Sequence, residues 1–244
     1  MTIHTRMRND RNLPRRVQPE VLDALSADDR AAKRARRDLR RLHHAMGTLP
    51  ILLRALDHVA GRCTMRTMLE LGAGDGSLML RVAQRRAARW PGVAVTLLDR
   101  QRVVEERTMQ GLRALGWTPS VVTADVFDWL ERPGVARWDV IVANLFVHHF
   151  ASPDLSRLLS MIAVRTLAFV CCEPRRSPVA LLGSELIALL GAGPVAREDA
   201  VLSVHAGFRG QELTAAWPQD GGWRLLEYPA GLFSHCLLAL RGGA

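Results

Sequence analysis

From Thr67 onward, short apolar runs alternate with longer amphipathic stretches. The apolar runs, which we predict to be strands, are Met68–Leu71, Val93–Leu98, Ser120–Thr123, Trp138–Ala143 and Leu167–Cys172. The amphipathic stretches, which we predict to be helices, are Ser77–Ala88, Gln101–Leu115, Pro153–Val164 and Pro178–Leu190. This alternation is typical of a parallel sheet with helices on both faces, and near-continuous apolar strands fit burial on both faces. The sequence therefore predicts an α/β fold with a doubly wound, mostly parallel sheet.

The two ends of the chain depart from this alternation. Near the C-terminus, Trp223–Tyr228 and Leu232–Leu240 read as two strands joined by the turn Pro229–Gly231, which predicts a C-terminal antiparallel hairpin strand. Residues 1–60 read as an N-terminal helical extension, and residues 61–244 as the main domain. Between the fifth strand and the hairpin, residues 175–222 are longer than one crossover helix requires. We expect this insertion and the N-terminal helices to roof a substrate pocket.

The 244-residue chain has a formal net charge of +9, which raises the question of a nucleic-acid partner. Almost all of this charge is arginine, since Lys33 is the only lysine. The densest basic run is Arg30–Arg41, and two interpretations of it stay open: the solvated face of a helix, or a docking surface for an acidic partner.

The sequence has no pattern typical of a membrane span, a secretory signal or a cysteine-bound metal. No apolar stretch reaches the roughly 18 residues that a membrane-spanning helix needs, and the basic N-terminus has no apolar segment behind it. We therefore expect no transmembrane segment, no secretory signal and a cytoplasmic protein. The four cysteines match no zinc-binding spacing, so the sequence predicts neither a metal nor a disulfide.

The first predicted strand runs into a glycine-rich loop, Glu70–Gly76, with glycines at 72, 74 and 76. Glycine permits a tight turn and a close approach of ligand to backbone. A dinucleotide fingerprint would need glycine at position 77, where the chain has Ser77. No lysine follows the loop, which excludes a phosphate-binding P-loop.

The next three strands also end in polar residues, at the edge where parallel sheets bind ligands. Asp99 ends the second strand and suits the two hydroxyls of a ribose. Asp125 and Val126 follow the third strand and suit the amino group and ring of adenine. Asn144 ends the fourth strand. Four strand ends in this order predict a nucleoside-containing ligand.

Residues 67–172 resemble the class I S-adenosylmethionine-dependent methyltransferases, which have a Rossmann-like fold. The segments that carry the resemblance are MLELGAGDG (68–76), TLLDR (96–100), TADVFDW (123–129) and WDVIVANLFVHHF (138–150). Flanking stretches, PEVLD (19–23) and RRLHHAMG (40–47), are similar to a bacterial subgroup that acts on small molecules. The resemblance implies S-adenosylmethionine as cofactor and S-adenosylhomocysteine as product. It implies a cofactor-binding set comprising Glu70, Gly72, Ala73, Gly74, Gly76, Asp99, Arg100, Asp125, Val126, Asn144 and Leu145.

Methyl transfer is an in-line displacement, so catalysis depends largely on positioning, and a hydroxyl acceptor also benefits from a base. His148 and His149 follow the fourth strand and are our candidates for that base, His148 first; a packing or capping role for each stays open. Arg175, His205 and Arg209 are candidate substrate-binding residues, whereas His235 reads as a core residue.

Three functions remain open at this stage. The first is methylation of a small molecule, with an aromatic, polyketide-like or lipid-like hydroxyl preferred over carbon or nitrogen. The second is methylation of nucleic acid, chiefly RNA, which the sequence disfavours because residues 144–147 lack the Asn/Asp-Pro-Pro-aromatic motif and aromatic residues are only 5% of the chain. The third is a binding protein that keeps the scaffold without the activity. The oligomeric state is not predicted.

Overall fold

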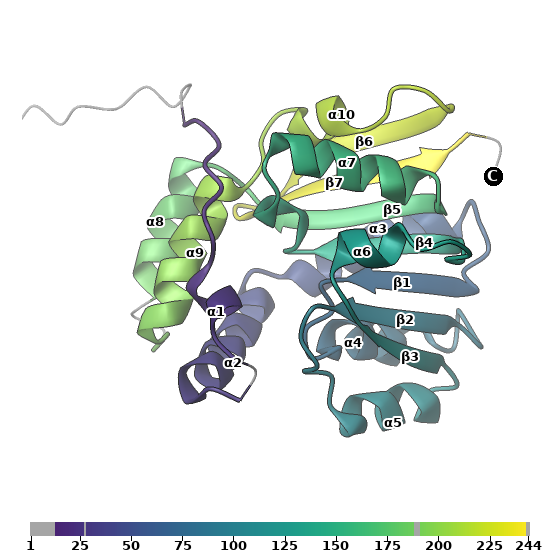
Figure 1. The fold of residues 1–244 in the computed structure, drawn as a ribbon, viewed down its shortest axis with the longest axis horizontal. Coiled ribbons are helices and arrows are strands. Elements are labelled where there is room, and N and C mark those ends of the chain that lie inside the picture. Colours follow the sequence, from purple (N-terminus) through teal and green to yellow (C-terminus); the bar gives the residue numbers. More distant parts are fainter. Residues whose placement is uncertain (1–12, 27, 188–190, 243–244) are drawn as a thin grey trace, which may run out of the picture.

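Seven strands form one sheet in the computed structural model, which describes residues 13–26, 28–187 and 191–242 (Figure 1). The strand order is β3-β2-β1-β4-β5-β7-β6. The strands are β1 (Thr67–Leu71), β2 (Ala94–Asp99), β3 (Thr118–Thr123), β4 (Trp138–Asn144), β5 (Thr166–Pro174), β6 (Trp223–Ala230) and β7 (Ser234–Arg241). The first five are parallel, whereas β7 pairs antiparallel with both β5 and β6. The predicted fold class is confirmed.

The strand order changes direction between the neighbouring strands β1 and β4. From β1 the sheet extends through β2 to β3 on one side, and from β4 through β5 to the hairpin on the other. Leu71 pairs with Ala143 in β4 and with Leu98 in β2, so the carboxyl ends of the three central strands lie together. Ligands bind in the crevice at such a switch in strand order.

Helices cover both faces of the sheet (Figure 1). One face packs against α3 (Thr48–Ala60), α4 (Ser77–Arg86) and α5 (Glu106–Ala114). The other packs against α6 (Val126–Leu130), α7 (Ser152–Ala163) and α10 (Glu212–Ala216). Successive side chains along a strand point to opposite faces of the sheet, so each strand contributes to two apolar cores. In β4, Val140 and Val142 belong to the core under α3, α4 and α5. Ile141 and Ala143 belong to the core under α6, α7 and α10.

Four helices form a separate group beyond the carboxyl ends of the parallel strands (Figure 1). They are α1 (Val21–Ala24), α2 (Arg30–Ala45), α8 (Pro178–Leu186) and α9 (Pro194–Ala206), and we call them the cap. Polar contacts join its N-terminal and inserted parts: Asp199 accepts hydrogen bonds from Val21 N at 2.7 Å and Leu22 N at 3.1 Å, and Asp38 accepts one from Gly193 N at 2.9 Å.

Several boundaries differ from the sequence predictions. Strand β5 continues to Pro174, and Pro229 and Ala230 belong to β6 instead of a turn. Helix α6 was not predicted, because its five residues are too few to show a helical period. Edge strand β3 is largely exposed, so burial on both faces does not extend to it.

Parts of two predictions lie outside the described residues. These are most of the basic N-terminal segment, residues 1–12, and the end of the helix predicted over 178–190. None of the described helices has the length and apolar character needed to cross a membrane.

The apolar contacts of α3 make a testable contribution to stability. Leu56 is fully buried against the sheet, so Leu56→Ala should lower the free energy of unfolding by about 2–5 kcal/mol. Leu182→Ala on α8 is the matched control, because Leu182 is 57% exposed and its loss should change stability by less than about 0.5 kcal/mol. Urea denaturation measures both, and equal effects would contradict the packing described.

Candidate active site

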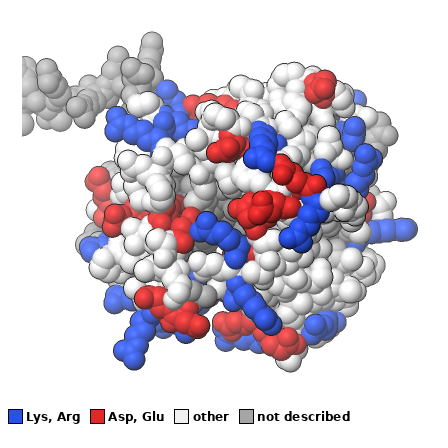
Figure 2. Space-filling model, in the orientation of Figure 1, with Lys and Arg blue, Asp and Glu red and all other residues white. Residues whose placement is uncertain are grey.

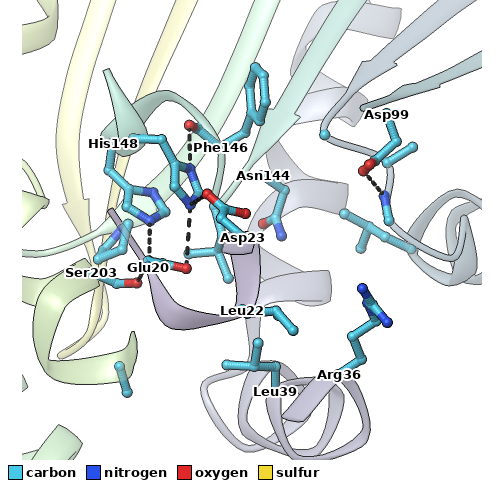
Figure 3. A pocket seen from close by; sticks show the side chains of 18 of the residues that line it. Glu20, Leu22, Asp23, Arg36, Leu39, Asp99, Asn144, Phe146, His148 and Ser203 are labelled. Carbon is cyan, nitrogen blue, oxygen red and sulfur yellow. Dashed lines mark hydrogen bonds and ion pairs between the residues drawn. The ribbon is translucent and has the colours of Figure 1, made fainter. Parts of the chain in front are cut away.

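A cavity of about 740 Å³ lies between the carboxyl ends of the central strands and the cap. This volume is within the range of roughly 300–1,000 Å³ typical of small-molecule sites. Its floor comes from the loops after β1, β2 and β4 and the residues after β3, and its roof from residues 17–23 and helices α2, α8 and α9. Figure 3 shows its interior, with the strand ends and the cap on opposite sides. Residues of the N-terminal segment and of the insertion thus line the cavity, and their role as the roof of a substrate pocket stays a prediction.

The glycine loop forms one wall of the cavity and is held by Asp99. Gly72, Ala73 and Gly74 line the cavity. Asp99 Oδ2 accepts a hydrogen bond from Gly74 N at 2.7 Å, and its Oδ1 accepts one from Gln101 N at 2.8 Å (Figure 3). The carboxylate at the end of β2 therefore fixes the shape of the loop after β1.

Two polar atoms in the cavity wall have no hydrogen-bond partner among the described residues. They are Glu70 Oε2 and Asn144 Oδ1, both buried, at or near the ends of the adjacent strands β1 and β4. Buried polar atoms are rarely left unsatisfied, so the pair predicts a ligand that donates hydrogen bonds. Burial, followed by the charges of Asp75 and Asp99, raises the pKa of Glu70 well above its ordinary value.

The remaining residues of the predicted cofactor set fall into two groups. Arg100, Asp125, Val126 and Leu145 line the cavity. Gly76 does not; it packs into the protein, where a Cβ would lie 2.9 Å from Leu97 Cδ1.

Asp125 and Leu145 each show a local feature at the cavity wall. Asp125 caps α6 by accepting a hydrogen bond from Phe127 N at 2.8 Å. Leu145 is the one non-glycine residue with positive φ (54°) in the described part of the chain. Such strain is typical of ligand-binding turns.

At the cap end of the cavity, two histidines meet a glutamate from the N-terminal segment (Figure 3). His148 Nε2 lies 3.3 Å from Glu20 Oε1, and His149 Nε2 lies 3.3 Å from Glu20 Oε2. His148 Nδ1 lies 2.7 Å from Glu173 Oε2, and His149 Nδ1 donates to Phe146 O at 2.9 Å. The cluster joins the cap to the short helix η1 (Val147–His149) that follows β4.

The two carboxylates decide the protonation of His148. Burial lowers the pKa of His148, but hydrogen bonds and charges from Glu173 and Glu20 outweigh it and raise the pKa to about 9. Burial likewise raises the pKa of Glu20, but its bonds to His148 and His149 hold that pKa well below its ordinary value. The bonds to the two carboxylates therefore favour the protonated imidazolium of His148, which disfavours His148 as the base. His149, which is 24% exposed, is the histidine more accessible from the cavity.

The proposed substrate-binding residues do not come together at the cavity. Arg175, His205 and Arg209 are absent from its described lining. Arg175 donates to Gly231 O at 3.2 Å, His205 O accepts from Arg16 N at 3.0 Å, and Arg209 N bonds Glu212. His235 is buried and bonds Glu227 at 2.8 Å, which is the core role predicted for it.

Sequence reasoning missed the residues that the cap contributes. Glu20, Asp23, Arg36, Arg40 and Ser203 line the cavity, and Arg40 forms an ion pair with Asp75 of the glycine loop. The segment PEVLD, which contains Glu20 and Asp23, was noted only as a family likeness. Arg36 and Arg40 belong to the basic run 30–41 and face the cavity, and the Arg40 side chain is also 41% exposed.

Comparison with solved structures identifies the fold. The plantazolicin methyltransferase BpumL, solved with a pentazolic desmethylPZN analog and SAH, is 12% identical with a TM-score of 0.58, covering 84% of this chain and 90% of its own. Magnesium protoporphyrin IX methyltransferase from Synechocystis PCC 6803, with bound SAH, is 15% identical with a TM-score of 0.50, covering 88% of both chains. Mitomycin 7-O-methyltransferase is 21% identical with a TM-score of 0.56, covering 91% of this chain and 60% of its own.

The chain has a methyltransferase fold. At these identities the likeness is one of fold. No family model matches the sequence, and no curated protein matches it.

The glycine loop yields a prediction that separates backbone strain from crowding. Gly72 and Gly74 both have positive φ, 66° and 54°, but a Cβ on Gly72 would lie 2.4 Å from Phe146 Cδ2, whereas one on Gly74 would meet nothing within 4 Å. Gly74→Ala should cost about 1–2 kcal/mol from backbone strain alone. Gly72→Ala should cost a further 1–3 kcal/mol or so from overpacking. Urea denaturation compares the two, and equal losses would contradict the close approach of Phe146.

Proposed function

We propose that this protein is an S-adenosylmethionine-dependent methyltransferase that methylates a small molecule. The observation that carries the proposal is the composition of one cavity. The predicted cofactor residues other than Gly76 line one part of it in the order expected from β1 to β4, and the histidine cluster lines another part under the cap (Figure 3). The three solved structures with this fold are named as methyltransferases, and two contain SAH.

The residues present suit the cofactor. The unpartnered Glu70 Oε2 and Asn144 Oδ1 are acceptors, and the α-ammonium group of the methionine part supplies donors. Asp99 has lone pairs left for ribose hydroxyls after its two backbone bonds, and Val126 offers an apolar surface to the adenine. The cofactor supplies a methyl group on a positively charged sulfur, and the chain's task is to align that methyl with an acceptor atom.

The cap favours a small acceptor. Apolar side chains on the cap side, including Leu22, Leu39, Ile187 and Val204, suit an aromatic, polyketide-like or lipid-like molecule. We propose an acceptor hydroxyl that binds beside His149, with His148 behind it as a positioning residue. One neighbour is named as a 7-O-methyltransferase of mitomycin, which supports this choice of atom.

The charge distribution does not favour a nucleic-acid substrate. On the face shown in Figure 2, Lys and Arg side chains are interspersed with Asp and Glu. In the cap, Arg34 and Arg41 both pair with Asp38 and Lys33 pairs with Asp28, so these three cations of the basic run have acidic partners. A nucleic-acid site needs a continuous basic surface instead.

The proposal predicts cofactor-dependent methyl transfer. Incubation with radiolabelled S-adenosylmethionine should transfer counts to members of a panel of phenols and hydroxylated polyketides, and none to total RNA. Asp99→Asn should weaken S-adenosylhomocysteine binding roughly 10–100-fold in calorimetry, because it removes a charge-assisted acceptor. Asp220→Asn, an exposed residue outside the described cavity lining, is the matched control and should bind normally. No cofactor binding by the unaltered protein, or transfer to RNA alone, would overturn the proposal.

Glu70 predicts that cofactor binding releases a proton. Burial and the charges of Asp75 and Asp99 raise its pKa well above the ordinary value in the free protein, which favours the protonated carboxyl. The cationic cofactor favours the carboxylate and lowers this pKa on binding, so affinity should rise with pH between the bound and free pKa values. Calorimetry over a series of pH values, each in two buffers of different ionisation enthalpy, measures the proton release, and Glu70→Gln should reduce it. Proton uptake by the unaltered protein would contradict this role.

A further inference from the structure

The cluster at the cap end of the cavity has a second property that a base does not require. Glu20, His148 and His149 each offer one ligand-type atom, and these atoms all lie within 4.8 Å of one another. We propose that Glu20, His148 and His149 bind a divalent transition-metal ion, for which Zn²⁺ is the representative. Imidazole and carboxylate are ligands that such ions accept, and two histidines with one glutamate form a known catalytic zinc set.

The distances within the cluster, which are long for hydrogen bonds, are also those expected between two ligands of one ion. The Nε2 atoms of His148 and His149 each lie 3.3 Å from a Glu20 oxygen. Hydrogen bonds from N–H to oxygen are usually about 2.9–3.0 Å long. Nitrogen and oxygen ligands lie about 2.0–2.1 Å from Zn²⁺, so two of them at a tetrahedral angle are separated by roughly 3.3 Å.

Each of the three ligands is held by a partner outside the proposed coordination sphere. His148 uses Nδ1 to bond Glu173 at 2.7 Å, and His149 uses Nδ1 to donate to Phe146 O at 2.9 Å. Both imidazoles therefore present Nε2 toward Glu20. The Ser203 hydroxyl donates to Glu20 Oε1. Histidines that bind metals almost always make this kind of bond through the other ring nitrogen, because it fixes the ring and its tautomer.

The local charges also suit a divalent cation. Glu173 is fully buried, and Glu20 is only 11% exposed, so the cluster contains two carboxylates with little access to water. On binding the ion His148 would release the proton on Nε2, and a doubly charged cation with two neutral imidazoles would balance the two carboxylates. Asp23 Oδ2, 4.0 Å from His149 Nε2, adds further negative charge on the same side.

Three protein ligands leave a coordination position for a water or a substrate atom, as in catalytic zinc sites. The three ligand residues all line the cavity, so we place that position toward the acceptor. This role rests on the proposed methyl transfer, whereas metal binding itself does not. A hydroxyl bound there would lose its proton to water more readily, and its oxygen would then take the methyl group as the carbon–sulfur bond breaks.

Metal binding can be measured without any assay of activity. Protein treated with a chelator and dialysed should bind one Zn²⁺ per chain in calorimetry, and Co²⁺ should give visible absorption bands of a low-symmetry site. Glu20→Gln and His149→Ala should each weaken Zn²⁺ binding at least 100-fold and abolish the Co²⁺ bands. Circular dichroism and thermal unfolding would show that both variants are folded. His58→Ala is the matched control, because His58 is exposed on α3 and outside the described cavity lining.

The results separate this proposal from the alternative of a metal-free ion-pair cluster. Absence of Zn²⁺ binding by the unaltered protein, or equal binding by all variants, would overturn the metal site. Asp99→Asn should lose cofactor binding and keep Zn²⁺, whereas His149→Ala should lose Zn²⁺ and keep the cofactor. Zn²⁺ binding without methyl transfer would therefore refute the proposed function and leave the metal site standing.

Discussion

The buried carboxylate of Glu173 organises the acceptor end of the cavity. It accepts hydrogen bonds from Phe146 N at 3.1 Å and Val147 N at 3.1 Å, and it bonds His148 through both the backbone and the ring. A charge with no exposure to water is tolerable only when it is bonded this completely. Because Glu173 is on β5 and its partners follow β4, these bonds fix η1 against the sheet. The positions of both histidines depend on that one residue.

Polar contacts that cross from one segment of the chain to another help to attach the cap. Arg15 donates to His148 O at 3.0 Å, Phe150 O at 2.9 Å and Ala206 O at 2.7 Å, so it ties the N-terminal segment to both η1 and α9. Arg40 pairs with Asp75 of the glycine loop. Hydrogen bonds and partly exposed ion pairs each contribute only about 1 kcal/mol, because water competes for the same groups. The apolar cores on the two faces of the sheet hold the scaffold more firmly than these contacts hold the cap.

The sequence predicted the sheet side of the site well, for a physical reason. Strands have a short period and their carboxyl ends meet at one edge, so Glu70, Asp99 and Asn144 could be placed together from the local pattern alone. The cap side could not be predicted in this way. Glu20 meets His148 across 128 residues of chain, and nothing in the local pattern of either segment encodes that contact. Arg175 was misplaced because β5 runs on to Pro174 and directs the following residue toward the hairpin.

Under the proposed function, different parts of the chain form the cofactor end and the acceptor end of the cavity. Glu70, Asp99 and Asn144 are fixed by the sheet, whereas Glu20 comes from the cap. Movement of the cap would separate Glu20 from the two histidines and leave the cofactor residues on the strand ends in place. The proposed metal site could not be predicted from the cysteine spacing, since its three candidate ligands come from two distant segments that only folding brings together.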